Sequence, residues 1–336
     1  MPIEFMFTSP QRIASAPVER EIYRVADSER GALTLRLASA LRSSRSLAST
    51  AAVTTAIESR SASKVVKAIS WPLFESSYTR AFLKSAIPLA AQGARVGAGE
   101  ITSAAQRKHA ERAFAVKADY VFDLKNAKSI EWIREYAGQH VEQITEISRD
   151  AIRSLVEMSF RDGIPPRALA RMLRDYIGLD ARFAMAAYKF ERGLTSAGFA
   201  PDVIEKKAGD YAGRLLRARA DRIARTETIR AANAGQKLLW KDAQANGLLG
   251  AGVVRVWISS GDACEICVGL DGETAGIDEL FAGEYDQPPD PHPSCRCAMG
   301  IEFLYSAPSQ VEIEVAEVAQ SDVDRIADDL SDEIAA

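Results

Sequence analysis

All four cysteines of the 336-residue chain fall within one short segment near its C-terminal end. Cys264 and Cys267 form a CxxC pair, and His292, Cys295 and Cys297 follow as an HxxCxC cluster. A CxxC turn brings two thiolates to one point, and tetrahedral zinc accepts such a pair together with two further sulfur or nitrogen ligands. The spacing therefore predicts a structural Zn2+ site, with three candidates for its two remaining positions.

Other states of these cysteines remain open. They could be unligated thiols, or they could form disulfides after assembly. The start of the chain lacks a basic region followed by a long apolar one, which predicts synthesis in a cytoplasm, where disulfides are uncommon. A thioredoxin-type redox pair is not favoured, because no βαβ pattern surrounds it. A catalytic zinc is not favoured either, because four or five donors can close the coordination sphere.

The elements that carry these donors look like a small β module over residues 253–305. Residues 253–259 are rich in β-branched and aromatic side chains, which indicates a strand, and a second strand is indicated over 295–303. On such a strand Cys295 and Cys297 would share one face. Between the strands the chain is rich in Gly, Pro and Asp, so we expect loops. A module this small has too little core without a metal.

Residues 119–252 are predicted to form a helical body. Apolar residues recur at helical spacing over about 129–161. Gly178 has the place of a left-handed C-cap after a second helix, and Asp180 can cap a third. A fourth helical stretch, with room for one break, is expected over about 201–246.

The two ends of the chain differ in charge. Residues 1–117 hold about 17 Lys and Arg against about 9 Asp and Glu, whereas the residues after Ala307 hold about nine acids opposed only by Arg325. Such blocks indicate interaction surfaces for two different partners, although both could equally be solvated faces. The basic front includes an expected helix after Trp71, and the acidic tail carries the narrow apolar stripe of a short helix.

Together these patterns predict an α+β protein: a mostly helical body with a small, loop-rich C-terminal β module stabilised by zinc. The expected division is a helical or arm region, a helical body, the Cys/His β module and an acidic tail with a possible short helix. These four parts span residues 1–118, 119–252, 253–305 and 306–336.

An ordered set of motifs across roughly residues 140–303 resembles the phage Mu F-like head-morphogenesis family. The motifs are Gly163-Ile164-Pro165, Ile177-Gly178-Leu179, Ala224-Arg225-Thr226-Glu227, Asn233-Ala234-Gly235, Trp240, Trp257-Ile258-Ser259, Asp262-x-Cys264-x-x-Cys267, Leu270-x-Gly272, Pro288-Pro289 and His292-Pro293-x-Cys295-Arg296-Cys297. Residues 1–117 show no such match.

The resemblance implies a minor head protein that resides in the virion, inside the head or at its portal vertex, after assembly in the host cytoplasm. Its expected partners are the portal protein and other head proteins, with double-stranded DNA as a further partner of the basic N-terminal region. No membrane partner is expected, because no stretch reaches the roughly 18 apolar residues that a span needs.

Four more residues are candidates for joining the module to the body. Arg225 and Glu227 are expected to reach the β module and fix its orientation, although Glu227 could instead form a surface ion pair with Arg230 at i, i+3 spacing. Trp240 and Trp257 are expected to pack at the same joint rather than to stack on bases.

Two further functions are alternatives to a structural head protein. One is a DNA-binding or ejection protein of the virion interior. The other is a toxin-type enzyme such as an ADP-ribosyltransferase or a nuclease, because toxin domains follow this region in several relatives. The ordered Arg, Ser-Thr-Ser and paired-Glu motifs of such a transferase were not found, and only about thirty residues follow the module. We therefore expect no catalytic residues and no enzyme.

Overall fold

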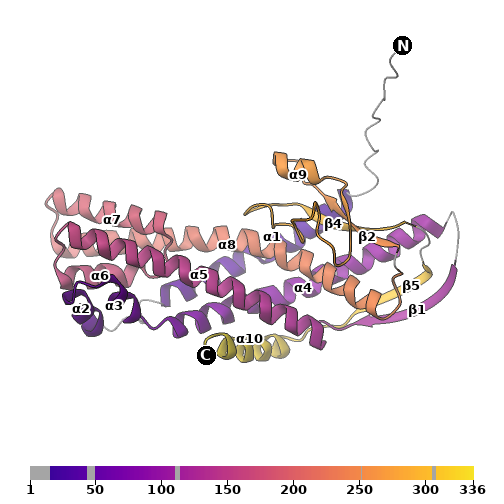
Figure 1. Cartoon of the computed structure of the whole chain (residues 1–336), viewed down its shortest axis with the longest axis horizontal. Helices are drawn as coiled ribbons and strands as arrows, with labels where there is room; N and C mark the ends of the chain where they lie inside the picture. Colours follow the sequence, from indigo (N-terminus) through magenta and orange to yellow (C-terminus); the bar gives the residue numbers. More distant parts are fainter. Residues whose placement is uncertain (1–15, 44–49, 110–113, 251, 305–307) are drawn as a thin grey trace, which may run out of the picture. The chain divides into compact units, whose positions relative to one another are not determined.

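A computed structural model describes the whole chain except residues 1–15, 44–49, 110–113, 251 and 305–307. In chain order its elements are α1 (Ala16–Ser43), α2 (Thr50–Glu58), α3 (Ala62–Lys67), α4 (Trp71–His109), β1 (Phe114–Phe122), α5 (Ala127–Arg161), α6 (Pro166–Tyr176), α7 (Ala181–Ser196), α8 (Pro201–Ala245), β2 (Val253–Ile258), α9 (Glu265–Leu270), β3 (Thr274–Gly276), β4 (Ala298–Phe303), β5 (Pro308–Val315) and α10 (Gln320–Ile334) (Figure 1). The described chain is mostly helical with a few short strands, which confirms the α+β class.

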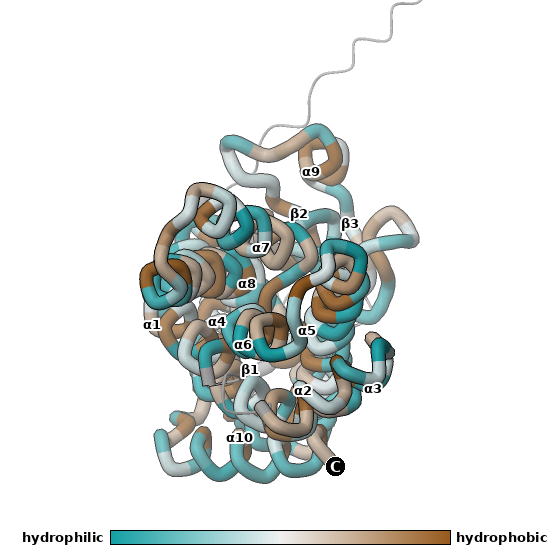
Figure 2. The backbone as a smooth tube through the Cα atoms, turned by 90° about the vertical axis from the view of Figure 1, so that its left-hand side faces the viewer, coloured by the Kyte–Doolittle hydropathy of each residue, from teal (hydrophilic) through white to brown (hydrophobic). Residues whose placement is uncertain are grey.

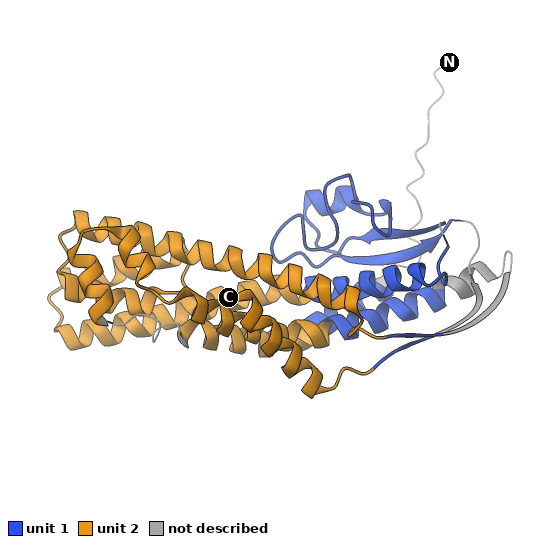
Figure 3. Cartoon of the chain, turned by 60° about the horizontal axis from the view of Figure 1, so that its bottom comes forward, with its two compact units in different colours: residues 1–26, 90–122, 229–316 blue, residues 27–89, 123–228, 317–336 orange. Residues whose placement is uncertain are grey.

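The chain divides into two compact units, coloured separately in Figure 3. Unit 1 comprises residues 1–26, 90–122 and 229–316, and unit 2 comprises the rest. Each unit gathers segments that are far apart in sequence, and α1, α4 and α8 contribute residues to both. The four consecutive domains expected from sequence stay predictions, because the two units are defined by spatial contacts and not by consecutive segments.

Unit 2 is built around α5, which confirms the helix expected over 129–161. The helix begins at Asn126, whose side chain accepts a hydrogen bond from the backbone N–H of Ser129 and so satisfies one free donor of the first turn. Its buried stripe includes Ile133, Ile152 and Leu155. Helices α6 and α7 pack beside it, and α2 and α3 lie in the same unit.

The turn between α6 and α7 follows the sequence expectations. Gly178 adopts φ 89°, a left-handed conformation that glycine reaches without steric cost. The Asp180 side chain accepts a hydrogen bond from the Phe183 N–H, so this residue is the N-cap of α7. Arg219 of α8 is 3% exposed and donates to the carbonyls of Gly178 and Ile144, which fixes the turn on the helical core. Helix α8 runs from 201 to 245 without the break that the sequence allowed.

The acidic tail contains a docked helix. In α10, Val323, Ile326 and Leu330 are at most 5% exposed, so the apolar stripe is buried in unit 2 and the tail is not frayed. Figure 2 shows this helix coloured mostly for hydrophilic residues. The oppositely charged ends also pair with each other in part, because Arg80 and Lys84 of the basic front form ion pairs with aspartates of α10. These cations are therefore already neutralised within the chain.

Unit 1 contains a three-stranded antiparallel sheet in the order β3-β2-β4. Strand β2 is central, and its register against β4 runs from Val253 opposite Phe303 to Ile258 opposite Ala298. This sheet with α9 and the connecting loops, residues 252–304, is called the Cys/His module below. It confirms the expected strand near 253–259, while the second strand begins at Ala298 and not at Cys295.

A second, two-stranded sheet corrects the sequence interpretation. Strand β1 pairs in parallel with β5, with Tyr120 opposite Ile313 and Phe122 opposite Val315. The sequence analysis predicts strands only within residues 253–305, so it misses both β1 and β5. Parallel partners nearly 200 residues apart leave no local turn signal.

Two glycines set a close helix crossing within unit 1. A Cβ atom on Gly235 of α8 would lie 1.9 Å from the carbonyl oxygen of Ala90, and one on Gly93 of α4 would lie 1.9 Å from that of Ala232. The two backbones therefore approach so closely that no side chain fits at either position. Gly235 belongs to the Asn-Ala-Gly motif singled out from sequence, and this contact gives its physical reason.

Candidate metal centre

Helix α9 brings the CxxC pair into position. Cys264 is the residue before the first turn of α9, and Cys267 lies within the helix. Cys264 is exposed, whereas Cys267 is fully buried and directed into the module. This short helix therefore supplies two sulfurs to the same site, one exposed at Cys264 and one buried at Cys267.

His292 approaches the buried thiol through one ring nitrogen. Its Nε2 lies 3.2 Å from the Sγ of Cys267, and its Nδ1 lies 3.0 Å from the carbonyl oxygen of Pro293. A proton on Nδ1 would be donated to that carbonyl, which leaves the Nε2 lone pair for a metal. Ser294 follows with φ 63°, and this tight turn returns the chain towards the next cysteine.

Cys295 and Cys297 complete the cluster from the stretch before β4. Both are buried, and the sulfurs of Cys267 and Cys295 are 3.6 Å apart. The expectation that the last two cysteines lie on a strand was wrong, because β4 begins at Ala298. The Arg296 side chain between them is part exposed, pairs with Asp262 and lies over the ring of Tyr23, 5.4 Å from its centroid.

The five donors form two overlapping groups, Cys264–Cys267–His292 and Cys267–Cys295–Cys297, and within each group the ligand atoms lie within 4.8 Å of one another. Tetrahedral zinc with Zn–S bonds of about 2.3 Å sets its sulfurs about 3.8 Å apart. The 3.6 Å sulfur separation and the 3.2 Å sulfur–nitrogen separation are close to such edges. The donor set therefore fits a closed zinc site, with Cys267 common to both groups.

Hydrogen bonds lower the pKa of two thiols of the cluster, which favours their negatively charged thiolate form. A hydrogen bond from the Cys295 thiol lowers the pKa of Cys297 to about 6. Backbone hydrogen bonding from Cys267 lowers the pKa of Cys264. Burial, followed by the charge on Cys297, raises the pKa of Cys267 to about 12. Thiolates are the form that binds metal, so a cation would displace the proton that Cys267 keeps in its absence.

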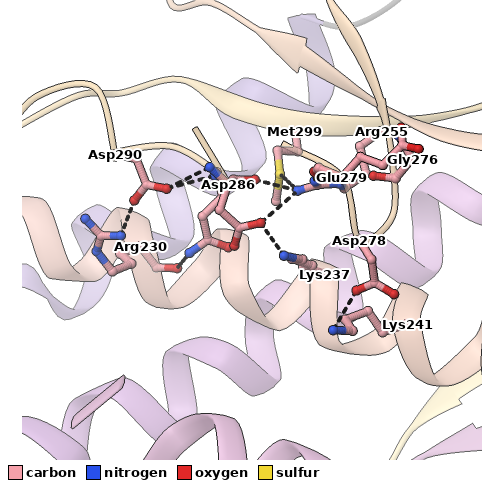
Figure 4. Close-up of polar contacts among 11 residues, drawn as sticks. Arg230, Lys237, Lys241, Arg255, Gly276, Asp278, Glu279, Asp286, Asp290 and Met299 are labelled. Atoms are coloured by element: carbon pink, nitrogen blue, oxygen red, sulfur yellow. Dashed lines mark hydrogen bonds and ion pairs between the residues drawn. The ribbon is translucent and has the colours of Figure 1, made fainter. Parts of the chain in front are cut away.

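A fully buried arginine organises the loops around this site (Figure 4). Arg255 of β2 donates to the carbonyl oxygens of Gly276 at 3.1 Å, of Asp286 at 2.5 Å and of Glu279. Its guanidinium also lies 4.8 Å from the ring centroid of Phe281. Burial lowers the pKa of Arg255, opposed first by the nearby Asp286 carboxylate. One side chain thus ties the end of β3 to the loops around Glu279 and Asp286.

Helix α8 holds the same loops from the other side (Figure 4). Arg230 pairs with Asp290, Lys237 pairs with Asp286, and Lys241 pairs with Asp278 at 2.6 Å. The three cations lie along one face of the helix, because separations of seven and four residues correspond to about two turns and one turn. Burial lowers the pKa of Lys237, while its hydrogen bond to Asp286 opposes the shift.

Two buried amides of α8 reach the strand that follows the cysteines. Asn233 accepts a hydrogen bond from the Met299 N–H at 3.2 Å and donates to the Cys297 carbonyl at 3.4 Å, while Gln236 donates to the Met299 carbonyl at 3.2 Å. Both amides are 0% exposed. The entry to β4 is therefore fixed to the helix by side chains that satisfy its backbone.

Comparison with known families supplies the classification. Residues 150–300 match the model of the family described as Phage Mu protein F like protein. This stretch is a Mu F-like region. The match confirms, over this stretch, the resemblance that the motifs indicated. No curated protein and no solved structure matched the chain significantly.

Among the described helices, none combines the length and apolarity needed to cross a membrane.

The Mu F-like region includes the two residues expected to anchor the module. Arg225 is exposed. Glu227 is buried in unit 2, where it accepts a hydrogen bond from Tyr136 and lies 3.9 Å from His140. An anchoring role for this pair stays a prediction. In unit 1 the contacts to the module come from Arg230 and from residues up to about three turns beyond it, Asn233, Gln236, Lys237 and Lys241. The sequence singled out Asn233 through its motif, whereas Lys237 and Lys241 looked like solvated helix positions.

Both tryptophans of the Mu F-like region are buried in unit 1. Trp240 is 0% exposed and donates from Nε1 to the Gly97 carbonyl at 3.2 Å. Trp257 is also 0% exposed and packs edge to face on Phe281, with ring centroids 5.3 Å apart. Rings buried in this way serve packing, because base stacking needs an open face.

Proposed function

We propose that this chain is a minor head protein that acts in phage head morphogenesis as a structural component. The observation that carries the proposal is the family match over residues 150–300. In this role the Cys/His module is a rigid surface for protein contacts, and the helices of unit 2 provide a second one. In such a role the protein contributes a defined shape and binding surfaces to the assembling head.

Within this role we assign the cysteine cluster to structural zinc. The support is a donor set of four sulfurs and one imidazole, compact enough for tetrahedral geometry. The module around it is rich in loops and has a small core, so a bound metal would add stability. Cys267 is common to both donor groups, and the other positions are filled from Cys264, His292, Cys295 and Cys297.

The portal protein is the partner that we propose for this assembly role. The direct test is to tag the chain in assembled heads and locate the tag by electron microscopy, together with co-purification of the portal protein. We expect signal at the portal vertex or in the lumen next to it. A chain that is missing from purified heads, or that leaves no assembly defect when it is removed, would overturn the proposal. Cys267→Ser is the matched variant that tests whether the module is needed for incorporation.

A virion-interior DNA-binding protein is the second candidate. Its support lies in exposed cations of α7 and α8, such as Lys189, Lys206 and Arg214, which form no ion pair within the described part of the chain. Contacts to phosphates release counterions, so affinity for double-stranded DNA should fall steeply, by about 10-fold or more, as salt rises from about 50 to 200 mM. A flat salt response would exclude this candidate without affecting the assembly role.

A further inference from the structure

Helix α10 occupies a defined site on unit 2. Three apolar side chains on one face of the helix, Val323, Ile326 and Leu330, are 1%, 5% and 3% exposed. Ala327 between them is fully buried. The opposite face carries most of the acidic side chains, so the helix is amphipathic and uses its apolar side for docking.

Arg80 of α4 contacts the C-terminal half of α10 through several polar groups. Its Nε lies 2.6 Å from Asp328, and its second terminal nitrogen lies 3.6 Å from Asp332 and 3.1 Å from the Ser331 hydroxyl. Ser331 is fully buried, so the arginine reaches the edge of the apolar contact. A planar guanidinium with several donors suits this arrangement better than an ammonium would.

Three more cations rim the same site from separate segments. Lys84 of α4 pairs with Asp324 at 2.9 Å, and Lys125, in the turn before α5, pairs with Asp322 at 3.1 Å. Arg134 of α5 pairs with Glu333 at 3.1 Å. We call the surface of unit 2 beneath α10, rimmed by Arg80, Lys84, Lys125 and Arg134, the α10 groove. The burial of the apolar stripe of α10 and the basic rim show that this surface accepts an acidic amphipathic helix.

Helix α10 is held weakly enough to undock from unit 2 while the rest of the chain stays folded. A single 15-residue helix is marginal alone in water, so α10 is helical because it is docked. Its ion pairs are part exposed, and pairs of this kind are weak and screened by salt. Segments held by few apolar contacts open locally well before the whole protein unfolds. The residues just before the helix, 316–319, are not part of any helix or strand.

We propose that the α10 groove is an exchangeable docking site and that its second occupant is α10 of another copy of this chain. Another copy carries the same apolar stripe and the same acids, so every contact of the docked helix can form between two chains. A tethered helix competes at an effective concentration of about millimolar. Dilute chains therefore stay closed, whereas chains gathered at high local density exchange helices and associate. This inference goes beyond the proposed function and does not depend on it.

Two complementary variants of the full chain test the exchange. The first lacks residues 317–336 and has an open groove. The second carries Arg80→Glu and Lys84→Glu, which repel its own Asp324, Asp328 and Asp332 and free its helix. We expect each variant alone to be monomeric and their mixture at about 100 µM to form a one-to-one complex in light scattering, weakened as salt rises. A mixture that stays monomeric, with both variants keeping their helical circular dichroism, would overturn the proposal.

A charge reversal provides the matched control. Adding Asp328→Arg to the second variant sets an arginine against Arg80 in the open groove, so complex formation should fall by about 10-fold or more. A complex that survives this change does not use the α10 groove and would also contradict the proposal. The same holds if the first variant loses its helical signal, because a helix that folding requires cannot be exchanged.

Discussion

The Cys/His module of unit 1 and the helices of unit 2 maintain their structures by different means. In unit 2, long helices bury continuous apolar stripes, such as that of α5 with Ile133, Ile152 and Leu155. The module has a short sheet and long irregular loops, and its loops are held by a buried arginine, ion pairs to α8 and a cluster of metal-ligating side chains. The difference predicts that the loss of a single polar side chain disrupts the module, whereas unit 2 tolerates the loss of one.

The largest effect should come from Cys267→Ser. Because Cys267 belongs to both donor groups, its loss removes a ligand from either way of completing the site. We expect the module to become sensitive to limited proteolysis while the helical circular dichroism of the chain is largely kept.

Cys264→Ser is the matched control for that experiment. Cys264 is exposed and belongs to one donor group only, so a remaining set with His292 or Cys297 can still close the site. Equal protease sensitivity of the two variants would show that the metal, if bound, does not depend on the arrangement derived above.

Arg255→Met should have the next largest effect. The change leaves the carbonyls of Gly276, Glu279 and Asp286 without their buried donor, at a cost of about 2–4 kcal/mol. Urea-induced unfolding followed by tryptophan fluorescence measures it. Arg225→Met removes an exposed arginine and should change stability by no more than about 0.5 kcal/mol. A larger loss there would support the anchoring role expected from sequence.

Gly235→Ala tests the helix crossing of unit 1. The new Cβ would meet the Ala90 carbonyl oxygen at 1.9 Å, so backbone must move, at a cost of about 1–3 kcal/mol in thermal or urea unfolding. Gly213 lies in the same helix with nothing within 4 Å of an added Cβ. Gly213→Ala should therefore stabilise the chain by about 0.5–1 kcal/mol. Equal effects of both changes would contradict the close approach.

The smallest effect concerns pH and the docking of α10. Hydrogen bonds from Lys125 and Lys84 lower the pKa of Asp322 and of Asp324 below 3.8. Because these pKa values are lowered by folding, the stabilisation is complete above about pH 4 to 5 and is lost as the pH falls through the lowered values. We expect proteolytic cleavage near residue 317 to increase below about pH 4 and to stay constant from pH 5 to 8. Constant cleavage down to pH 2 would show that the ion pairs contribute nothing.

The same contrast explains how far the sequence could lead. Helical periodicity predicted α5 and the apolar stripe of α10, and residue type predicted the N-cap at Asp180. Each of these signals is contained in a few neighbouring residues. Cysteine spacing predicted the donor cluster, although Cys295 and Cys297 do not lie on a strand as expected, because β4 begins at Ala298.

What the sequence could not show depends on long-range pairing. Strands β1 and β5 are parallel and distant, so neither contains a sign of the other. The buried role of Arg255 was also hidden, because an arginine between valines in a strand is usually assigned to the solvent face. Lys237 and Asp286 became partners only when α8 and the loop were brought together.

Metal analysis of the purified full-length chain tests the central claim most directly, combined with titration of its free thiols before and after chelation. If the donors around Cys267 hold structural zinc, we expect about one zinc per chain, protected thiols, and a module that loses protease resistance once the metal is removed. Less than about half a zinc per chain, with all four thiols reduced and the module still resistant, would contradict the account.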